Sequence, residues 1–389
     1  MASIKNFDLE DFLANYWQQK PLLIRGGLAD FEFPLMPDDL AGMACEEEVE
    51  SRIIIGSTED GYQLSNGPFD EQVFANLPKK DWTLLVQAVD HFIPEVAALL
   101  DPFRFIPNWR VDDVMVSYAS EGGNVGPHYD NYDVFLVQGL GQRDWQIGQF
   151  CDEQTELVGH ESLKLIKDFQ CQQQWTLQPG DILYVPPRVA HWGKGLGDDC
   201  MTYSVGFRAP SHGEILGHFC DEQLATIDDF ARFTDQQLAQ QDNPGEISNA
   251  AIEQVQQILT RFIDDKQAIT QWFGRFMTEP KYPELHDEEP EQFDNQEVDI
   301  LLAESDFLYR NPSSRFAFTE TDKNGQLTLY VDGRSWRCQS DEIELAKLLC
   351  ANTQIATLDL PFRLKETRLF KTLFNQGAIY IDDIEDADD

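Results

Sequence analysis

The stretch GPHYDNYDVF, residues 126–135, begins with a Gly-Pro turn and runs into the apolar residues typical of a buried strand. Residues two positions apart in a strand point to the same face, so His128 and Asp130 can present an imidazole and a carboxylate to one ion. Tyr129 then points the other way. A His-x-Asp pair is a weak signal by itself, because two polar residues on an exposed strand produce the same pattern.

A second stretch, QPGDILYVPPRVAH (178–191), supplies a candidate third ligand. A Pro-Gly turn begins a buried strand, a Pro-Pro turn ends it, and His191 stands where the next strand begins. A neighbouring strand of the same barrel would place His191 beside His128 and Asp130. Two histidines and one carboxylate form the facial triad typical of non-haem Fe(II) oxygenases, whereas zinc more often recruits thiolates or a third histidine.

The flanking residues 1–209 are rich in short apolar runs separated by Gly, Pro and Asn turns. Short strands at this density predict a sandwich or barrel with helices packed outside it. Helices are expected near residues 9–17 and 82–100. The expected strands include residues 21–25, 51–55, 114–118, 134–137 and 182–185.

A helical zone follows the β-rich zone. Apolar residues recur at helical spacing over residues 215–231 and 252–276, which predicts two long amphipathic helices. Their apolar faces must be buried, either on their own domain or against a second copy of the chain, and we favour the second copy. From Glu284 to Asp299 the chain has eight acidic residues and no Lys or Arg, which indicates a solvated linker.

The last zone, residues 300–389, predicts a small winged-helix-like domain. It carries two hairpin signals, Asn324-Gly325 and Asp332-Gly333. Ser340 is expected to cap a helix, and a second helix over residues 366–375 precedes a short strand. Basic residues near that helix raise the question of DNA binding, which the acidic tail at 382–389 opposes. These basic residues are Arg363, Lys365, Arg368 and Lys371.

The charge of the whole chain limits its partners. Acidic residues number 69 and basic residues 29, a net charge of −40, so binding to nucleic acid is disfavoured. The excess favours either solubility or a basic protein partner. The amino terminus lacks the features of a signal peptide, and no apolar run approaches the roughly 20 residues of a membrane span. The seven cysteines form no C-x-x-C pair, which favours a cytoplasmic protein with reduced thiols.

From Phe105 to Pro210 the chain resembles the JmjC-type Fe(II)/2-oxoglutarate oxygenases of the cupin superfamily, and most of all the bacterial ribosomal oxygenases. The resemblance implies a double-stranded β-helix (jelly roll) catalytic domain over 1–210, a helical dimerisation domain over 211–282, an acidic linker over 283–299 and a winged-helix-like domain over 300–389. It rests on NYWQQKPLLIR (15–25), IPNWRVDDVMVSYA (106–119), GPHYDNYDVFLVQGLGQRDWQIG (126–148), PGDILYVPPRVAH (179–191) and YSVGFRAP (203–210).

The resemblance also implies the cofactor site. Fe(II) would be held by His128, Asp130 and His191, and the co-substrate 2-oxoglutarate would complete the coordination. Arg143 matches the family position for the cation that pairs with the distal carboxylate of 2-oxoglutarate, and Ser117 matches the hydroxyl. Two alternatives stay open: Arg143 forms a surface ion pair with Asp144, or Arg208 holds the carboxylate instead.

The activity implied is that of a 2-oxoglutarate-dependent dioxygenase that uses O2 to hydroxylate the β-carbon of an arginine in a basic large-subunit ribosomal protein. The alternatives are a histidine hydroxylase of the same family and a non-catalytic metal-binding cupin that acts as a regulator. Carboxylates near the metal strand could receive a guanidinium or serve structure alone: Asp112, Asp113 and Asp133. The stretch EGGNV (121–125) departs from the family pattern, which leaves the substrate-access surface in question.

Overall fold

The computed structural model describes residues 3–59, 61–159, 163–236, 238–286, 293, 295–321, 325–365 and 367–381. The chain divides into two compact units, Met1–Ala209 with Glu284–Asp287, and Pro210–Pro283 with Glu288–Asp389. Residues 287–292 and 294 of the expected linker, the turn residue Asn324 and the acidic tail at 382–389 lie outside the described residues. No helix in the described part of the chain is long and apolar enough to cross a membrane.

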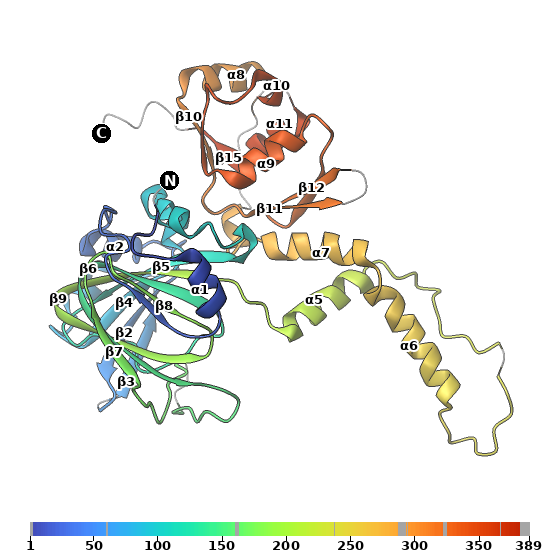
Figure 1. The fold of residues 1–389 in the computed structure, drawn as a ribbon, viewed down its shortest axis with the longest axis horizontal. Coiled ribbons are helices and arrows are strands. Elements are labelled where there is room, and N and C mark those ends of the chain that lie inside the picture. Colours follow the sequence, from blue (N-terminus) through green and yellow to red (C-terminus); the bar gives the residue numbers. More distant parts are fainter. Residues whose placement is uncertain are drawn as a thin grey trace. The chain divides into compact units, whose positions relative to one another are not determined.

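The first unit is built on a curved antiparallel sheet, which Figure 1 shows closing into a barrel. Within the described residues its nine strands follow the order β1-β8-β6-β9-β5-β4-β2-β3, and β7 pairs with β6. Their bounds are β1 Leu22–Ile24, β2 Ser51–Ser57, β3 Gly61–Asn66, β4 Trp82–Val86, β5 Val111–Ala119, β6 Asp133–Phe150, β7 Gln173–Leu177, β8 Ile182–Val185 and β9 Val189–Phe207.

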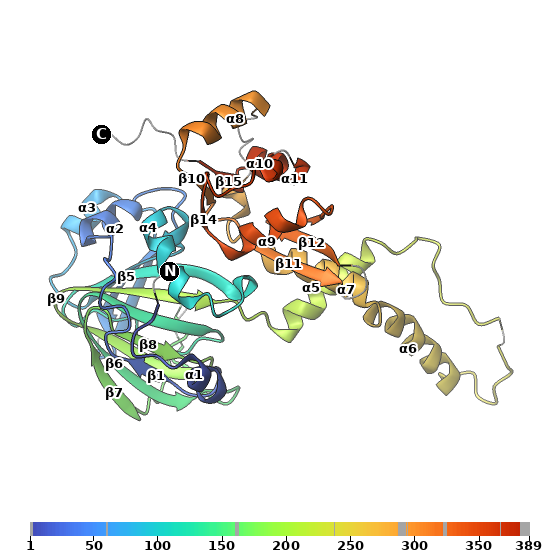
Figure 2. The same ribbon diagram turned by 45° about the horizontal axis from the view of Figure 1, so that its top comes forward.

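Short helices surround this barrel, and Figure 2 shows α2, α3 and α4 together on one side of it. The α-helices are α1 Leu9–Asn15, α2 Pro37–Met43, α3 Glu71–Ala75 and α4 Pro94–Ala97, and the 3₁₀ turns are η1 Val89–His91, η2 Ala98–Phe103 and η3 Asn108–Arg110. A fourth 3₁₀ turn, η4, covers Pro283–His286.

The long strand β6 has two different partners along its length, because it bends. Its first part pairs with β8 and its second part with β7, while β9 follows it on the other side with register shifts near the bend. Gly141 stands at this bend with φ of +62°, and a Cβ there would lie 1.7 Å from the carbonyl oxygen of Asp199. Only glycine fits that position, so the bend that curls the sheet is encoded locally.

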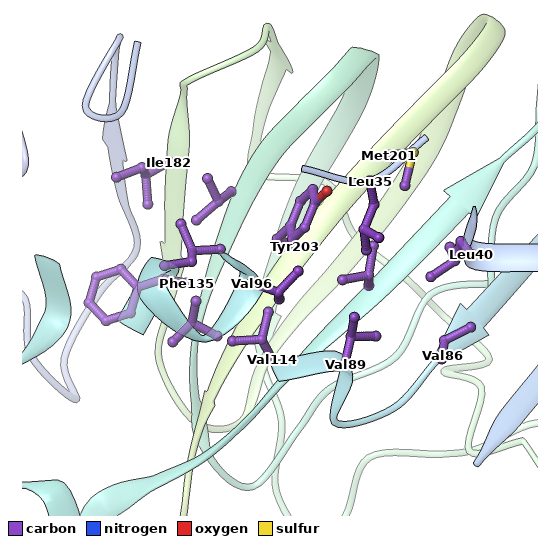
Figure 3. Packing of buried hydrophobic residues seen from close by; sticks show 14 of the residues in the cluster. Leu35, Leu40, Val86, Val89, Val96, Val114, Phe135, Ile182, Met201 and Tyr203 are labelled. Carbon is purple, nitrogen blue, oxygen red and sulfur yellow. The ribbon is translucent and has the colours of Figure 1, made fainter. Parts of the chain in front are cut away.

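The hydrophobic core lies between the helices and the inner face of the sheet. Phe12 of α1 is fully buried, and its ring centroid lies 5.7 Å from that of Phe135 and 4.9 Å from that of Tyr184. Figure 3 shows Phe135 of β6 and Val114 of β5 in the same cluster as Val96 of α4. Burial of these apolar side chains is what attaches the short helices to the barrel.

The prediction of one helix over residues 82–100 is wrong. Residues Trp82–Val86 form β4, which pairs with both β2 and β5, and α4 begins only at Pro94. A short apolar run is compatible with a buried strand or with a buried helix, and here the backbone pairing with two neighbouring strands decides the outcome.

In the second unit, α5 covers His212–Leu224, α6 Asn249–Ile263 and α7 Lys266–Thr278. The single helix expected over 252–276 is therefore two helices, because Asp265 caps the amino end of α7 through a hydrogen bond from the Ala268 N–H to its side chain. A Cβ at Gly274 would lie 2.4 Å from the ring of Tyr330, so α7 packs closely on the strand that carries this tyrosine.

The rest of the second unit contains two three-stranded sheets, β11-β12-β13 and β14-β10-β15, with helices between their strands. Asp332 and Gly333 both have positive φ, as the hairpin signal predicts. Ser340, expected to cap a helix, does not do so, because that helix begins at Ile343 with Glu342 at its N-cap. Thr367 caps the last helix. The elements are α8 Asn295–Glu304, β10 Phe307–Arg310, β11 Phe316–Thr321, β12 Gln326–Val331, β13 Arg334–Arg337, α9 Ile343–Ala351, β14 Gln354–Ala356, α10 Phe362–Lys365, α11 Arg368–Asn375 and β15 Ile379–Tyr380.

Candidate metal centre

His128 and His191 face each other across an isolated antiparallel bridge. The His128 N–H donates to the His191 carbonyl at 3.1 Å, and the His191 N–H donates to the His128 carbonyl at 2.8 Å. Asp130 accepts a third backbone bond, from the Arg188 N–H at 2.6 Å. The expected strand around His128 is thus a single bridge, because Pro127 has no N–H and Gly126 has positive φ.

The bridge brings the three candidate ligands together. One ligand atom from each of His128, Asp130 and His191 lies within 4.8 Å of the others, and they form the one group of this kind found among the described residues. The Asp130 Oδ2 lies 3.5 Å from the His191 Nε2, and the two imidazole centroids are 4.3 Å apart. His191 is buried while the other two are partly exposed, so the group opens to one side.

Both imidazoles have a defined tautomer. The Nδ1 of His128 donates to the Gly126 carbonyl at 2.9 Å, and the Nδ1 of His191 donates to the Val189 carbonyl at 3.0 Å. Because a carbonyl only accepts, each Nδ1 carries the proton and each Nε2 keeps its lone pair for a metal.

Burial, and then the neighbouring His128, lowers the pKa of His191 from its usual value near 6.5 to about 4. The ring is therefore neutral at neutral pH. Two neutral imidazole nitrogens and one carboxylate oxygen on one side suit Fe(II) with open positions opposite.

Arg143 of β6 is 5% exposed. Its Nε donates to the Cys200 Sγ at 3.4 Å and its Nη1 to the Ser117 Oγ at 3.4 Å, whereas its buried Nη2 has no hydrogen-bond partner among the residues that the structure describes. Leaving a buried donor unpaired costs about 1–3 kcal/mol, more for a charged group. The geometry therefore fits an anionic ligand at Arg143.

The alternative of a surface ion pair between Arg143 and Asp144 is wrong. Arg143 is buried, and within the described residues the Asp144 carboxylate accepts its hydrogen bond from Gln174 at 2.7 Å. The two side chains alternate along β6 and therefore point to opposite faces.

Trp145 connects Arg143 to the metal group. Its ring lies 5.7 Å from the Arg143 Cζ, and its centroid lies 5.9 Å from that of His191. A Cβ at Gly193 would come within 2.8 Å of the indole, so glycine at this position makes room for it. The buried indole Nε1 lacks a partner within the described part of the chain. Sequence reasoning missed Trp145, although alternation along QRDWQI places it on the same face as Arg143.

Arg208, the rival of Arg143, follows the last residue of β9. Its N–H donates to the Arg110 carbonyl at 2.5 Å, and its carbonyl accepts from the Arg110 Nε at 2.6 Å. In the register of β6 and β9, Arg143 pairs with Gly195, close to His191, whereas Phe207 pairs with Asp133. Counted along β9, the residue that pairs with Arg143 is therefore nearer to His191 than Arg208 is.

Two of the nearby carboxylates serve structure. Asp133 is fully buried and accepts hydrogen bonds from Gln18, Arg110 and Tyr184. Asp113 accepts from the Gln87 side chain and from the Ala88 N–H. Neither is available for a substrate guanidinium, while Asp112 is half-buried.

The residues of the stretch EGGNV, which left the substrate-access surface in question, differ in their exposure. Asn124 is 3% exposed and takes part in buried hydrogen bonds, whereas Glu121 is exposed and pairs with Lys80 at 2.6 Å.

The geometry predicts that each of the three ligands is needed for metal binding. Replacing His128, Asp130 or His191 by alanine should weaken Co(II) binding by at least about 100-fold, because the loss of an outer-shell partner alone costs 10–100-fold. Calorimetric titration of the metal-free protein measures the affinity. His212→Ala, which removes an exposed histidine, is the matched control and should bind as the wild type does. Equal affinity in all variants would contradict the assignment.

Comparisons with known proteins agree with this site. Residues 98–215 match the JmjC domain family, and residues 261–377 match the ROXA-like winged helix family. The chain is 37% identical to the ribosomal protein uL16 3-hydroxylase of Escherichia coli over 302 residues, which cover 77% of this chain and 79% of that protein. It is 34% identical to the probable ribosomal oxygenase of Haemophilus influenzae over 349 residues, 86% of this chain and 83% of the relative.

A solved structure gives a similar result. The ribosomal oxygenase YcfD of Escherichia coli, in complex with cobalt and 2-oxoglutarate, matches with a TM-score of 0.82 at 29% identity, covering 98% of this chain and 99% of YcfD. The predicted jelly-roll core followed by a winged-helix-like domain is thereby confirmed.

Proposed function

Because the chain belongs to the JmjC-domain ribosomal oxygenases, we propose that it is an Fe(II)- and 2-oxoglutarate-dependent dioxygenase that hydroxylates the β-carbon of an arginine in a large-subunit ribosomal protein. The observation that carries this proposal is the His128–Asp130–His191 group, with a buried, incompletely paired guanidinium on the same barrel wall. Its relatives in Escherichia coli and Haemophilus influenzae carry the names of a ribosomal protein hydroxylase and a ribosomal oxygenase.

In the proposed mechanism the protein holds and orients the metal ligands and limits the access of water. Fe(II) held by His128, Asp130 and His191, together with 2-oxoglutarate and O2, would supply the oxidising chemistry that an unactivated C–H bond requires. The two Nδ1–H···O bonds keep the imidazole rings oriented, so that each Nε2 stays directed at the ion. The buried position of His191 keeps water from one side of the group.

Arg143 is the proposed partner of the distal carboxylate of 2-oxoglutarate. Its Nε donates to Cys200 and its Nη1 donates to Ser117, which leaves Nη2 to donate to a carboxylate oxygen of the ligand. Planar guanidinium groups bind carboxylates through paired hydrogen bonds, and a buried pair of this kind offsets the desolvation of both charges. Ser117 then serves mainly to orient Arg143.

A basic substrate suits the charge around the metal group. Tyr132 stands two residues after Asp130. Desolvation of its phenol oxygen, and then the negative charges of Asp130, Asp113 and Asp112, raises the pKa of the hydroxyl, although the residue as a whole is 43% exposed. An arginine-rich protein would be attracted both by this local potential and by the net charge of −40. A ribosomal substrate also implies a cytoplasmic location, in keeping with seven cysteines that form no disulfide.

The substrate assignment predicts a specific mass change. In a strain that lacks this protein, one large-subunit ribosomal protein should lose the mass of one oxygen atom on an arginine, and a plasmid copy should restore it. A copy carrying His128→Ala should not. Mass spectrometry of intact and digested ribosomal proteins measures the change. Loss of the oxygen from a histidine instead would favour the sibling histidine hydroxylase, and an unchanged ribosome would contradict the proposal.

The co-substrate assignment predicts that Arg143 and Arg208 behave differently. Arg143→Met should raise the KM for 2-oxoglutarate by about 100-fold, because breaking a buried charge pair costs roughly 2–5 kcal/mol. Arg143→Lys should recover part of the loss, since it keeps the charge and loses the fork. Arg208→Met is the comparison and should leave this KM within a few-fold. The reverse ranking in a succinate-release assay would assign the carboxylate to Arg208.

We also propose that the chain forms a homodimer through the helices of residues 211–282. On α6 the apolar residues Ile252, Val255, Leu259 and Ile263 recur at helical spacing, and all four are between 43 and 62% exposed. No residue of α6 is buried within this chain, and Figures 1 and 2 show α6 lying away from the strands of its own unit. A stripe of this kind suits burial against the same stripe of a second copy.

The dimer proposal predicts that Ile252→Asp with Leu259→Asp converts the protein to a monomer, because two buried charges would face each other across the interface. Light scattering at micromolar concentration measures the mass. Gln257→Asp, on the other face of α6, is the matched control and should stay dimeric. A monomeric wild type would contradict the proposal.

A further inference from the structure

Asn124 is a buried hydrogen-bond centre beside the metal group. Its Oδ1 accepts from the Tyr62 hydroxyl at 2.6 Å, from the Gly126 N–H at 2.9 Å and from the Trp192 indole at 3.0 Å. Its Nδ2 donates to the Gly122 carbonyl at 2.8 Å. The indole and the backbone N–H can only donate, so the orientation of the amide is determined by its neighbours.

The hydrogen bonds of the Asn124 side chain stand where backbone hydrogen bonds between the loop before His128 and β9 are missing. The loop before His128 runs beside β9, and backbone bonds join Gly123 to Gly195 and His128 to His191. Five steps along the loop face four along β9, so the loop bulges between these two pairs. Pro127 lacks an N–H and Gly126 has positive φ, so this bulge cannot form regular pairs. The side chain of Asn124 takes the Gly126 N–H and reaches across to Trp192 instead.

The position of Asn124 connects both histidine segments. Gly126 lies two residues before His128 and its carbonyl accepts from the His128 Nδ1, whereas Trp192 directly follows His191. The hydroxyl of Tyr62 on β3, the last strand in the sheet order, donates to the same oxygen. One amide therefore restrains the approach of the two imidazoles, and its burial makes loss of these bonds costly.

We propose that Asn124 is a positioning residue that holds the His128 and His191 segments at the separation a metal requires. The inference concerns the order of the metal-free protein, and it rests on the proposed function only where metal binding is measured.

The first test is hydrogen exchange on the metal-free full-length chain. Asn124→Leu keeps the volume and removes all four bonds, so the amides in residues 122–130 and 189–195 should exchange about tenfold faster. Amides of β2 and β4 should be unchanged. Asn76→Leu, which replaces an exposed asparagine in the same unit, is the matched control. Unchanged exchange in the two segments, or a change in only one of them, would overturn the proposal.

A second test uses Trp192→Phe, which by itself should speed exchange at residues 122–130 and therefore stays informative if Asn124→Leu does not fold. Together with Asn124→Leu it forms a double-mutant cycle. Trp192→Phe removes the indole donor and keeps an aromatic ring, and Tyr62→Phe removes the phenolic donor. If Asn124 links the segments, the effect of Trp192→Phe on exchange at residues 122–130 should be largely absent in the Asn124→Leu background. If the effects of Trp192→Phe and Asn124→Leu on exchange were fully additive, the contact between Asn124 and Trp192 would not couple the two segments, which would contradict the proposal.

The metal readout separates this inference from the proposed function. Asn124→Leu should raise the Co(II) dissociation constant by about tenfold, in the range that outer-shell partners produce. Val96→Ala removes buried volume elsewhere in the same unit and should leave the affinity unchanged, which controls for lost stability. If the wild type failed to bind Co(II), the metal site would be refuted, whereas the exchange result would still decide whether Asn124 links the segments.

Discussion

Two backbone hydrogen bonds between His128 and His191 support the whole candidate site. This reciprocal pair holds the loop before β6 against the start of β9, and thereby places Asp130 within 3.5 Å of the His191 ring. Neither histidine segment could supply the site alone, since each contributes at most two of three ligands. The glycine bend in β6 lets this strand pair with β9 both before and after the bend. The metal group is thus a consequence of barrel closure, and its geometry depends on bonds that involve no side chain.

The exterior of the molecule is negatively charged, whereas the candidate site contains buried hydrogen-bond donors. The surface carries most of a net charge of −40, while the buried wall beside the metal group holds Arg143 and the indole N–H of Trp145, both lacking full hydrogen bonding within the described residues. Donors without acceptors are costly in a barrel interior, so the wall suits an anionic ligand. The exterior would attract a basic macromolecule, and the interior a small dianion. A dioxygenase that consumes 2-oxoglutarate while it hydroxylates a basic protein substrate needs both properties.

Two helices of the second unit, α6 and α7, differ in whether their apolar faces are covered within the chain. α7 is packed on the winged-helix strands, with Gly274 in contact with Tyr330 and the Gly333 N–H bonded to the Thr278 carbonyl. α6 instead exposes its apolar stripe. The amino-acid pattern is similar in the two helices, and the difference lies in whether a complementary surface exists within the chain. Dimerisation would use the part of the helical zone that intramolecular packing leaves uncovered.

Residue type and spacing were sufficient to identify His128, Asp130 and His191 as a candidate group, since a Gly-Pro turn, a Pro-Pro turn and a His-x-Asp pair are local features of the chain. Family resemblance supplied Arg143 and Ser117, which the barrel then brings to 3.4 Å of each other. The identity of residues 82–86 as a strand and the role of Asn124 were not accessible in this way. Each depends on partners that are distant along the chain, and a hydrogen bond or ring contact of that kind leaves no periodic trace in the amino-acid order. The local sequence therefore determined which residues are the candidate ligands, and long-range strand pairing determined which other side chains orient them.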